Sequence, residues 1–243
     1  MAVLATVPLN EDMTAQPARV RKMFGSIARR YDLANHLLSC GIDIYWRRRA
    51  AEVIAEWRPQ AIADLATGTG DLALTLQKKL PGADIVGLDV LPEMLDLAQR
   101  KGVRQVVLAD AMNLPFEDAS FDCVTIAFGL RNLENVVDAL TEMARVLKTN
   151  GHLLVLEFSL PAKSILRAIY RFYLHRCLPL IGSFLTGTKS AYDYLGDSIE
   201  EFPGGDAMCE LMQANGFMRP SFQSLTGGIV TIYTAEKSSP TSP

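Results

Sequence analysis

The chain has 243 residues, of which 49% are hydrophobic and 21% are charged, a composition typical of a globular protein rather than a disordered one. Its formal net charge of −3 gives no overall support for nucleic-acid binding, and no apolar run approaches the ~18 residues of a transmembrane helix. The N-terminus lacks a signal-peptide pattern, and the four cysteines have no metal-ligand or C-x-x-C spacing, so we expect a cytoplasmic protein with free thiols and no bound metal.

Most of the chain is predicted to form a single domain. Residues 1–16 and 236–243 show no hydrophobic periodicity and are expected to be loose tails. The domain covers residues 17–235, and its parts 17–57 and 161–200 are expected to form a helical cap. The sequence does not indicate an oligomeric state.

Strand-like and helix-like runs alternate through the middle of the chain. Hydrophobic periodicity, glycines and prolines predict helices over Val20–Tyr31, Ile42–Trp57, Asp71–Leu80, Pro92–Lys101 and Val136–Leu147. Short apolar runs predict strands over Ile62–Leu65, Asp84–Leu88, Gln105–Leu108, Phe121–Phe128 and His152–Phe158. Such a βαβ succession implies a parallel sheet with right-handed crossovers.

The alternation ends after the fifth predicted strand. Further helices are predicted over Lys163–Arg176, Ser190–Ile199 and Asp206–Asn215. Two β-rich runs, Ser221–Leu225 and Ile229–Thr234, flank a glycine pair and predict a hairpin. We therefore expect the α/β class: a doubly wound, mostly parallel, seven-stranded sheet with a C-terminal antiparallel hairpin and added N-terminal and cap helices.

A glycine-rich loop joins the first predicted strand to the helix that follows it. Gly68 and Gly70 have no Cβ atom, so backbone N–H groups there can come close to a ligand. The spacing Gly68-x-Gly70-x-x-Ala73 also fits the dinucleotide fingerprint of dehydrogenases, which by itself is a weak signal. The loop predicts a nucleotide-like ligand without identifying it.

Three aspartates lie at or near the ends of successive predicted strands. Asp64 precedes the loop and could order it or meet a cationic ligand group. Asp89 can accept hydrogen bonds from ribose hydroxyls, and Asp110 can accept one from an adenine amino group. Each aspartate alone could instead cap a helix or turn. Together, with no phosphate-binding Lys or Arg beside them, they favour a cationic adenosine compound such as S-adenosylmethionine.

This pattern favours a methyltransferase over two other functions. A nicotinamide dehydrogenase would also use Asp89, but its anionic diphosphate gains nothing from Asp64. A non-catalytic module that binds S-adenosylmethionine would keep the same acids. Ligand binding distinguishes the dehydrogenase, which would bind NAD and not S-adenosylmethionine. Turnover distinguishes the non-catalytic module, which would bind S-adenosylmethionine without methylating a quinol.

Three stretches resemble the menaquinone/ubiquinone C-methyltransferases, a branch of the class I S-adenosylmethionine-dependent methyltransferases. They are Tyr31–Trp46, Thr125–Asn132 and Arg145–Ser159, and the similarity extends from Val20 to Thr234. The resemblance implies C-methylation of a lipid-soluble prenylated quinol, demethylmenaquinol to menaquinol, with the benzoquinol precursor of ubiquinone as the alternative acceptor. It also implies that the cofactor is lined by Thr69, Asp89, Asp110 and Ala111.

The chain departs from the usual pattern of that family at several positions. Ala34 and Asp43 stand where members usually have Met and His, and Thr149-Asn150 replaces Pro-Gly. Ala127 replaces a serine of some members, so a side-chain contact to the cofactor is absent there. These changes leave the acids around the glycine loop in place and bear more on the acceptor than on the reaction.

Methyl transfer to a ring carbon needs an electron-rich acceptor, which a quinol provides as its phenolate. Arg131 cannot readily act as a base but can stabilise the phenolate, unless its role is structural, and Asn132 can hydrogen-bond the second ring oxygen. Histidine titrates near neutrality, so His175 is a candidate base, or else a surface residue. Tyr31 and Tyr192 are candidates for the walls of the ring pocket, or for core packing.

The predicted helix Lys163–Arg176 combines basic and apolar residues. Lys163, Arg167, Arg171 and His175 recur every four residues and form a basic stripe beside a broad apolar surface. This pattern suits a helix that makes transient contact with an anionic membrane surface, which a lipid-soluble quinol would require. An ordinary cap helix packed on the sheet is the alternative.

Overall fold

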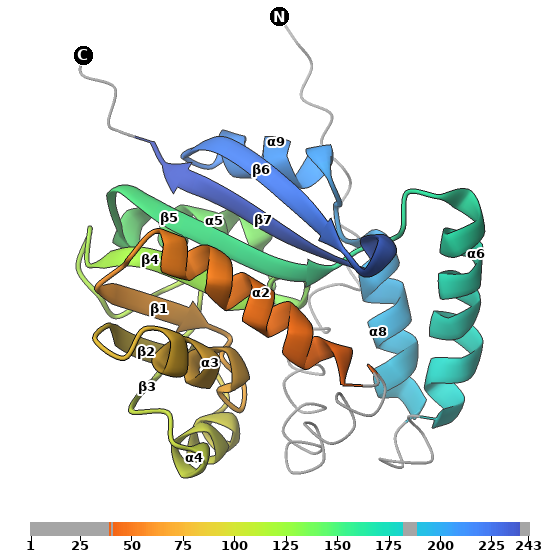
Figure 1. Ribbon diagram of the computed structural model, residues 1–243, viewed down its shortest axis with the longest axis horizontal. Coiled ribbons are helices and arrows are strands. Elements are labelled where there is room, and N and C mark those ends of the chain that lie inside the picture. Colours follow the sequence, from red (N-terminus) through yellow and green to blue (C-terminus); the bar gives the residue numbers. More distant parts are fainter. Residues whose placement is uncertain (1–38, 40, 182–188, 239–243) are drawn as a thin grey trace, which may run out of the picture.

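The structure is a computed structural model of the chain, and it describes residues 39, 41–181 and 189–238. The predicted N-terminal tail, the predicted helix Val20–Tyr31 and the candidate pocket residue Tyr31 lie outside the described residues. All elements named below belong to the described part, which Figure 1 colours from orange to blue.

The described residues form one seven-stranded sheet in the order β3-β2-β1-β4-β5-β7-β6. The strands are β1 (Ala61–Leu65), β2 (Asp84–Asp89), β3 (Gln105–Leu108), β4 (Phe121–Ala127), β5 (Leu147–Phe158), β6 (Phe217–Leu225) and β7 (Val230–Lys237). The first five strands pair in parallel, whereas β7 runs antiparallel to both β5 and β6. The predicted α/β class, doubly wound order and closing hairpin are confirmed.

Helices cover both faces of this sheet. One face carries α2 (Ile42–Glu56), α3 (Asp71–Lys79) and α4 (Pro92–Lys101), and the other carries α5 (Val136–Val146) and α9 (Asp206–Ala214). A third group consists of α6 (Ser164–Phe172), a π-helical turn (Tyr173–Cys177) and α8 (Lys189–Glu201). In Figure 1 this group stands at one end of the sheet, with α6 outermost.

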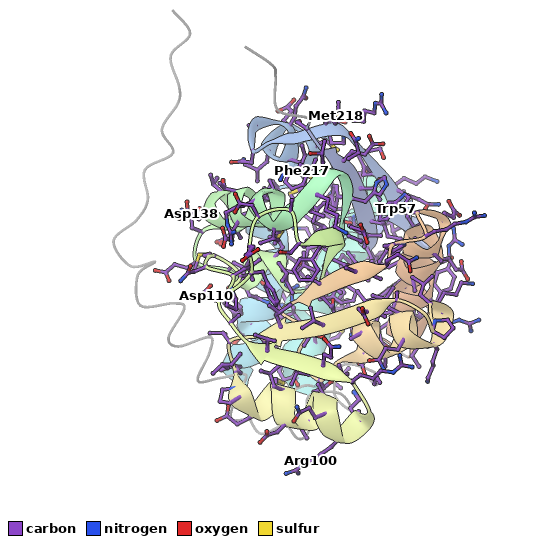
Figure 2. The ribbon with its side chains drawn as sticks, turned by 90° about the vertical axis from the view of Figure 1, so that its left-hand side faces the viewer. Trp57, Arg100, Asp110, Asp138, Phe217 and Met218 are labelled. Carbon is purple, nitrogen blue, oxygen red and sulfur yellow. The ribbon has the colours of Figure 1, made fainter. Side chains whose placement is uncertain are left out.

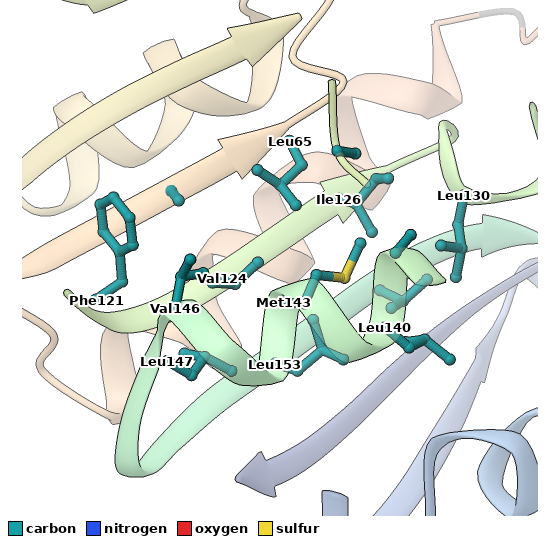
Figure 3. Packing of buried hydrophobic residues seen from close by; sticks show 14 of the residues in the cluster. Leu65, Phe121, Val124, Ile126, Leu130, Leu140, Met143, Val146, Leu147 and Leu153 are labelled. Carbon is teal, nitrogen blue, oxygen red and sulfur yellow. The ribbon is translucent and has the colours of Figure 1, made fainter. Parts of the chain in front are cut away.

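The core explains why the strands read as continuous apolar runs. Figure 3 shows Leu140 and Met143 of α5 lying across Val124 and Ile126 of β4. These four side chains are fully buried, and residues on the opposite face of the same strands are buried by α2 and α3. A parallel strand covered on both faces has no polar side, so its sequence shows no alternation.

The surface shows the opposite composition. Figure 2 shows Arg100 projecting outward from α4, whereas Phe217 at the start of β6 is only 1% exposed and packs beneath α9. The described part of the chain contains no helix long and apolar enough to cross a membrane.

Two strand boundaries differ from their predictions because of irregular backbone. β5 begins at Leu147 rather than His152, since Leu147 pairs with Phe121 before a register shift in that ladder. β6 begins at Phe217 rather than Ser221, because a bulge with φ of 50° at Arg219 interrupts the two-residue alternation.

The last strand also runs further than predicted. β7 continues to Lys237, whose ammonium donates a hydrogen bond of 2.6 Å to the carbonyl of Leu147. Residues 236 and 237 therefore belong to the sheet rather than to the predicted C-terminal tail.

Candidate functional site

A cavity of about 580 Å³ lies at the carboxyl ends of the central strands. At one end it is lined by the glycine loop and the three aspartates, and at the other by residues after β4 and from α6 and α8. The predicted residues that line it are Asp64, Gly68, Thr69, Asp89, Asp110, Ala111, Arg131, Asn132 and Tyr192. The structure thus brings together residues that were predicted separately for donor and acceptor.

The two glycines of the loop serve different purposes. Gly68 has φ of 56°, and a Cβ atom added there would meet nothing within 4 Å, so space remains open on the cavity side. Gly70 has φ of 84°, and its Cβ would lie 2.4 Å from Val103 Cγ2 and 3.1 Å from Ala98 Cβ. Gly70 therefore allows the loop to pack against α4, whereas Gly68 leaves room for a ligand.

Asp64 is a buried carboxyl group that lines the glycine-loop end of the cavity and is only 1% exposed. Its Oδ2 accepts a 2.6 Å hydrogen bond from the Thr67 hydroxyl, whereas Oδ1 has no hydrogen-bond partner. Burial raises the pKa of Asp64 to about 7, against the smaller opposing effects of Thr67 and the Arg47 charge. An unsatisfied buried carboxyl oxygen beside a cavity suits a cationic ligand group.

Asp89 and Asp110 both line the cavity and both accept hydrogen bonds that shape the turns around them. Asp89 accepts from the backbone N–H of Gly68 at 2.8 Å and of Leu91 at 3.0 Å, and burial raises its pKa. Asp110, on the loop after β3 (Figure 2), accepts from Met112 N–H at 3.0 Å. Both residues line the cavity, so the capping and ligand-binding interpretations are compatible, since each carboxyl oxygen can accept more than one hydrogen bond.

Thr69 and Ala111 complete the glycine-loop end of the cavity. Thr69 is 4% exposed, and its hydroxyl accepts a 2.9 Å hydrogen bond from the Lys101 ammonium. Ala111 is buried directly after Asp110 and contributes a small apolar surface to the cavity wall.

Arg131 follows β4 in a short 3-10 helix (Leu130–Asn132) and is held by Glu157 of β5. Its Nη1 donates to Glu157 Oε1 at 2.5 Å and to the Phe128 carbonyl at 2.8 Å. The Arg131 and Glu157 side chains are 4% and 0% exposed. Sequence reasoning missed Glu157 as a partner, although a lone acid inside the apolar run of β5 was a usable signal.

The charge of Arg131 acts on two phenol groups at the cavity. Tyr170 and Tyr194 line this end, and burial raises the pKa of both hydroxyls while the positive charge of Arg131 acts in the opposite direction. Arg131 Nε is buried and has no hydrogen-bond partner. The negative charge of Glu157 raises both pKa values, so a phenolic oxygen of a ligand in this space would meet the field of the Arg131–Glu157 ion pair, in which the effect of Arg131 is the larger one.

The side-chain amide of Asn132 makes hydrogen bonds within the protein through both its nitrogen and its oxygen. Its Nδ2 donates to the Phe128 carbonyl at 3.3 Å, and its Oδ1 accepts from the Tyr194 hydroxyl at 3.2 Å. Asn132 therefore orients Tyr194 at the cavity, a role that was not predicted. Tyr192 is 5% exposed and packs with Tyr170 and Leu174 while lining the same cavity, so its two predicted roles coincide.

His175 lies away from this group. It is in the π-helical turn, 39% exposed, with Nε2 2.9 Å from Glu200 Oε1 of α8. Arg171 contacts the same Glu200 carboxylate through both Nε and Nη2. Two members of the predicted basic stripe are therefore directed at α8, and no histidine is found among the described residues that line the cavity.

Comparison with known proteins identifies the family. The ubiE/COQ5 methyltransferase family matches residues 12–237. Demethylmenaquinone methyltransferase of Thermus thermophilus is 46% identical over 220 residues, covering 88% of this chain and 100% of that protein. Ubiquinone/menaquinone biosynthesis C-methyltransferase UbiE of Geobacter sp. strain M21 is 44% identical over 227 residues, covering 90% and 96%.

A solved structure shows the same fold at lower identity. An S-adenosylmethionine-dependent methyltransferase of Thermotoga maritima, described as a possible histamine N-methyltransferase, has a TM-score of 0.65 at 18% identity. The match covers 90% of this chain and 99% of that one, and it bears on the fold alone. Because the family match spans nearly the whole chain and both relatives are covered almost end to end, the chain belongs to the ubiE/COQ5 methyltransferase family.

Proposed function

We propose that the protein methylates a ring carbon of a prenylated quinol, demethylmenaquinol, with S-adenosylmethionine as the methyl donor. The family and the names of the two relatives support this function. The observation that carries it is that the same cavity is lined at one end by the glycine loop and its aspartates and at the other by a buried arginine and several tyrosines. Donor and acceptor can lie in the same cavity, as in-line methyl transfer requires.

The donor end fits S-adenosylmethionine by the chemistry of its side chains. The unpartnered Oδ1 of Asp64 suits a cationic group, and the space above Gly68 admits a ligand close to the backbone. Asp89 and Asp110 line the same cavity and would accept hydrogen bonds from ribose hydroxyls and from an adenine amino group. When bound, S-adenosylmethionine supplies an electrophilic methyl group, and the chain supplies binding and orientation.

At the acceptor end, Arg131 would favour the ionised quinol. Its guanidinium stays protonated, so it lowers the acceptor's pKa and stabilises the phenolate rather than removing the proton itself. Glu157 and the Phe128 carbonyl fix the guanidinium and leave Nε available for a ring oxygen. The carbon ortho to the phenolate would then take the methyl group as the sulfonium–methyl bond breaks, S-adenosylhomocysteine would be the leaving group, and the ring proton would pass to water as the ring regains aromaticity.

The protein would meet its lipid-soluble acceptor at a membrane surface, and α6 supplies a candidate face. Ile165, Ile169 and Phe172 are 77%, 61% and 63% exposed along this helix, which stands outermost in Figure 1. The exposed cations Lys163 and Arg176 flank this row, so its charge suits an anionic bilayer. Ile169 also lines the cavity, so the row leads directly into the site.

The choice of acceptor is tested by a methyl-transfer assay with labelled S-adenosylmethionine. We expect label in menaquinol when reduced demethylmenaquinone is offered, and much less label in a benzoquinol precursor at equal concentration. A preference for the benzoquinol would replace demethylmenaquinol with the alternative acceptor. Oxidised demethylmenaquinone is the control, since it lacks the hydroxyl whose ionisation activates the ring.

A further inference from the structure

Arg47 of α2 is a cation at the glycine-loop end of the cavity. It lines the cavity together with Asp64 and Gly68, and its side chain is 13% exposed. Among the described residues that line the cavity, the cations are Arg47 and Arg131, and Arg131 lies at the acceptor end against Glu157. The role of Arg47 is therefore distinct from that of Arg131.

The surroundings of Arg47 hold its guanidinium in place. Its Nη1 donates to Asp43 Oδ2 at 2.5 Å, one helical turn earlier, and its Nη2 is 3.8 Å from Asp71 Oδ2 at the start of α3. The guanidinium carbon lies 5.3 Å from the centroid of the Phe128 ring. Arginine has five N–H donors, so the bond to Asp43 leaves others for a ligand.

We propose that Arg47 binds the carboxylate of the donor's amino-acid end, while Asp64 binds the ammonium on the same carbon. This inference rests on the proposed function, because it requires S-adenosylmethionine as the donor. The donor carries two cationic groups and one anionic group, and the cavity offers acids for the former at this end. Arg47 is the described cation placed to receive the carboxylate.

The relation of Arg47 to Asp64 fits a zwitterionic ligand. An α-ammonium and an α-carboxylate share one carbon atom, so their partners must lie close together. Arg47 is near enough for its charge to oppose the rise in the pKa of Asp64. With Asp43 and Asp71 also nearby, a lone anion would be repelled, whereas a zwitterion is matched as a unit.

Isothermal calorimetry without acceptor tests this assignment with two ligands that differ by one group. They are S-adenosylmethionine and its decarboxylated form, each titrated into wild type and Arg47→Met. We expect Arg47→Met to weaken S-adenosylmethionine binding by roughly 10- to 100-fold, the range for losing a hydrogen bond to a charged group. Decarboxylated ligand should bind both proteins within about threefold of each other, as no carboxylate meets residue 47.

Arg49→Met is the matched control, because Arg49 lies on the same helix but is 36% exposed and pairs with Glu52. It should leave both affinities unchanged. If Arg47→Met does not fold, Arg47→Lys replaces it, with a smaller loss still confined to the ligand that has a carboxylate. Equal losses for both ligands, or no loss for either, would overturn the inference, whereas failure of wild type to bind S-adenosylmethionine would overturn the proposed function.

Discussion

Asp64 links the protonation of one buried carboxyl group to the stability of the fold. Its pKa is 3.8 in a model peptide and about 7 in the folded protein, so the folded state binds more protons between these values. The free energy of unfolding contributed by this group is therefore highest at low pH and falls as pH rises from about 4 to about 7. Above about pH 7 the buried carboxyl group is ionised in the folded protein too, and its contribution to the free energy of unfolding falls no further.

We accordingly expect Asp64→Asn to be more stable than wild type at pH 8, by on the order of 4 kcal/mol for a shift of this size, with little difference near pH 4. The amide oxygen can still accept the Thr67 hydrogen bond, so the local packing is kept. Urea unfolding at both pH values measures the effect. A stability difference that is the same at pH 4 and pH 8 would contradict it.

At the residue scale, sequence reasoning located the acids but missed their partners. Asp64, Asp89 and Asp110 could be placed because the carboxyl ends of parallel strands share one edge of a sheet. The pairing of Arg131 with Glu157 joins residues from different elements and depends on how β4 and β5 are aligned. The spacing of residues in the sequence does not determine that alignment. It also does not predict that the His175 side chain contacts Glu200.

At the scale of elements, the two glycines of the loop have different roles: Gly70 allows close packing, and Gly68 leaves space for a ligand. Gly70→Ala should destabilise the fold by roughly 2–4 kcal/mol, because left-handed backbone strain adds to a collision with Val103. Gly68→Ala meets open space, so we expect only about 1–2 kcal/mol of strain. Its main effect should be a loss of S-adenosylhomocysteine affinity of tenfold or more, as its Cβ enters the ligand's space.

Thermal unfolding and calorimetry on the same two variants check this division. Gly68→Ala should have the smaller loss in melting temperature and the larger loss in affinity per folded molecule. If Gly70→Ala instead lost more affinity and Gly68→Ala lost more stability, the loop would contact the ligand through Gly70.

The exposed apolar row of α6 makes a prediction about membranes. Phe172→Glu should reduce binding to vesicles that contain anionic lipid by at least several-fold, because it places a charge in the apolar contact. Val137→Glu on α5 is the matched control, since Val137 is also exposed, at 44%, but lies on another helix. Sedimentation with anionic and neutral vesicles measures both. Equal binding by Phe172→Glu and wild type would remove α6 from the contact.

Element prediction worked where the hydrophobic period was regular. The bounds of α4 and β3 are those expected, since proline, glycine and polar breaks mark their ends. The segment Lys163–Arg176 was predicted as one helix, but it divides into α6 and a π-helical turn. A π turn leaves no mark on the hydrophobic period, because it changes the hydrogen-bond spacing over only a few residues.

At the scale of the whole molecule, the sheet order creates the site. β1 lies between β2 and β4, in the middle of the five parallel strands, so the glycine loop, the acids at the ends of β2 and β3, and Arg131 after β4 all open on the same edge. Helices α6 and α8 close that edge and turn it into a cavity. The α/β order could be predicted from alternation alone, whereas the cap depends on tertiary packing. Of the two predicted cap parts, 161–200 supplies α6 and α8, but α2 of part 17–57 packs on a face of the sheet with α3 and α4.

The central claim is that this cavity holds a methyl donor beside a quinol activated by Arg131. The most direct test is transfer of labelled methyl to reduced demethylmenaquinone by wild type and by Arg131→Met/Glu157→Gln, which leaves no buried unpaired charge. We predict labelled menaquinol from wild type, a rate lower by on the order of 10²–10³-fold in the double variant, and unchanged S-adenosylmethionine affinity in both. An unaltered rate in the variant, or donor binding by wild type without any labelled menaquinol, would contradict the account.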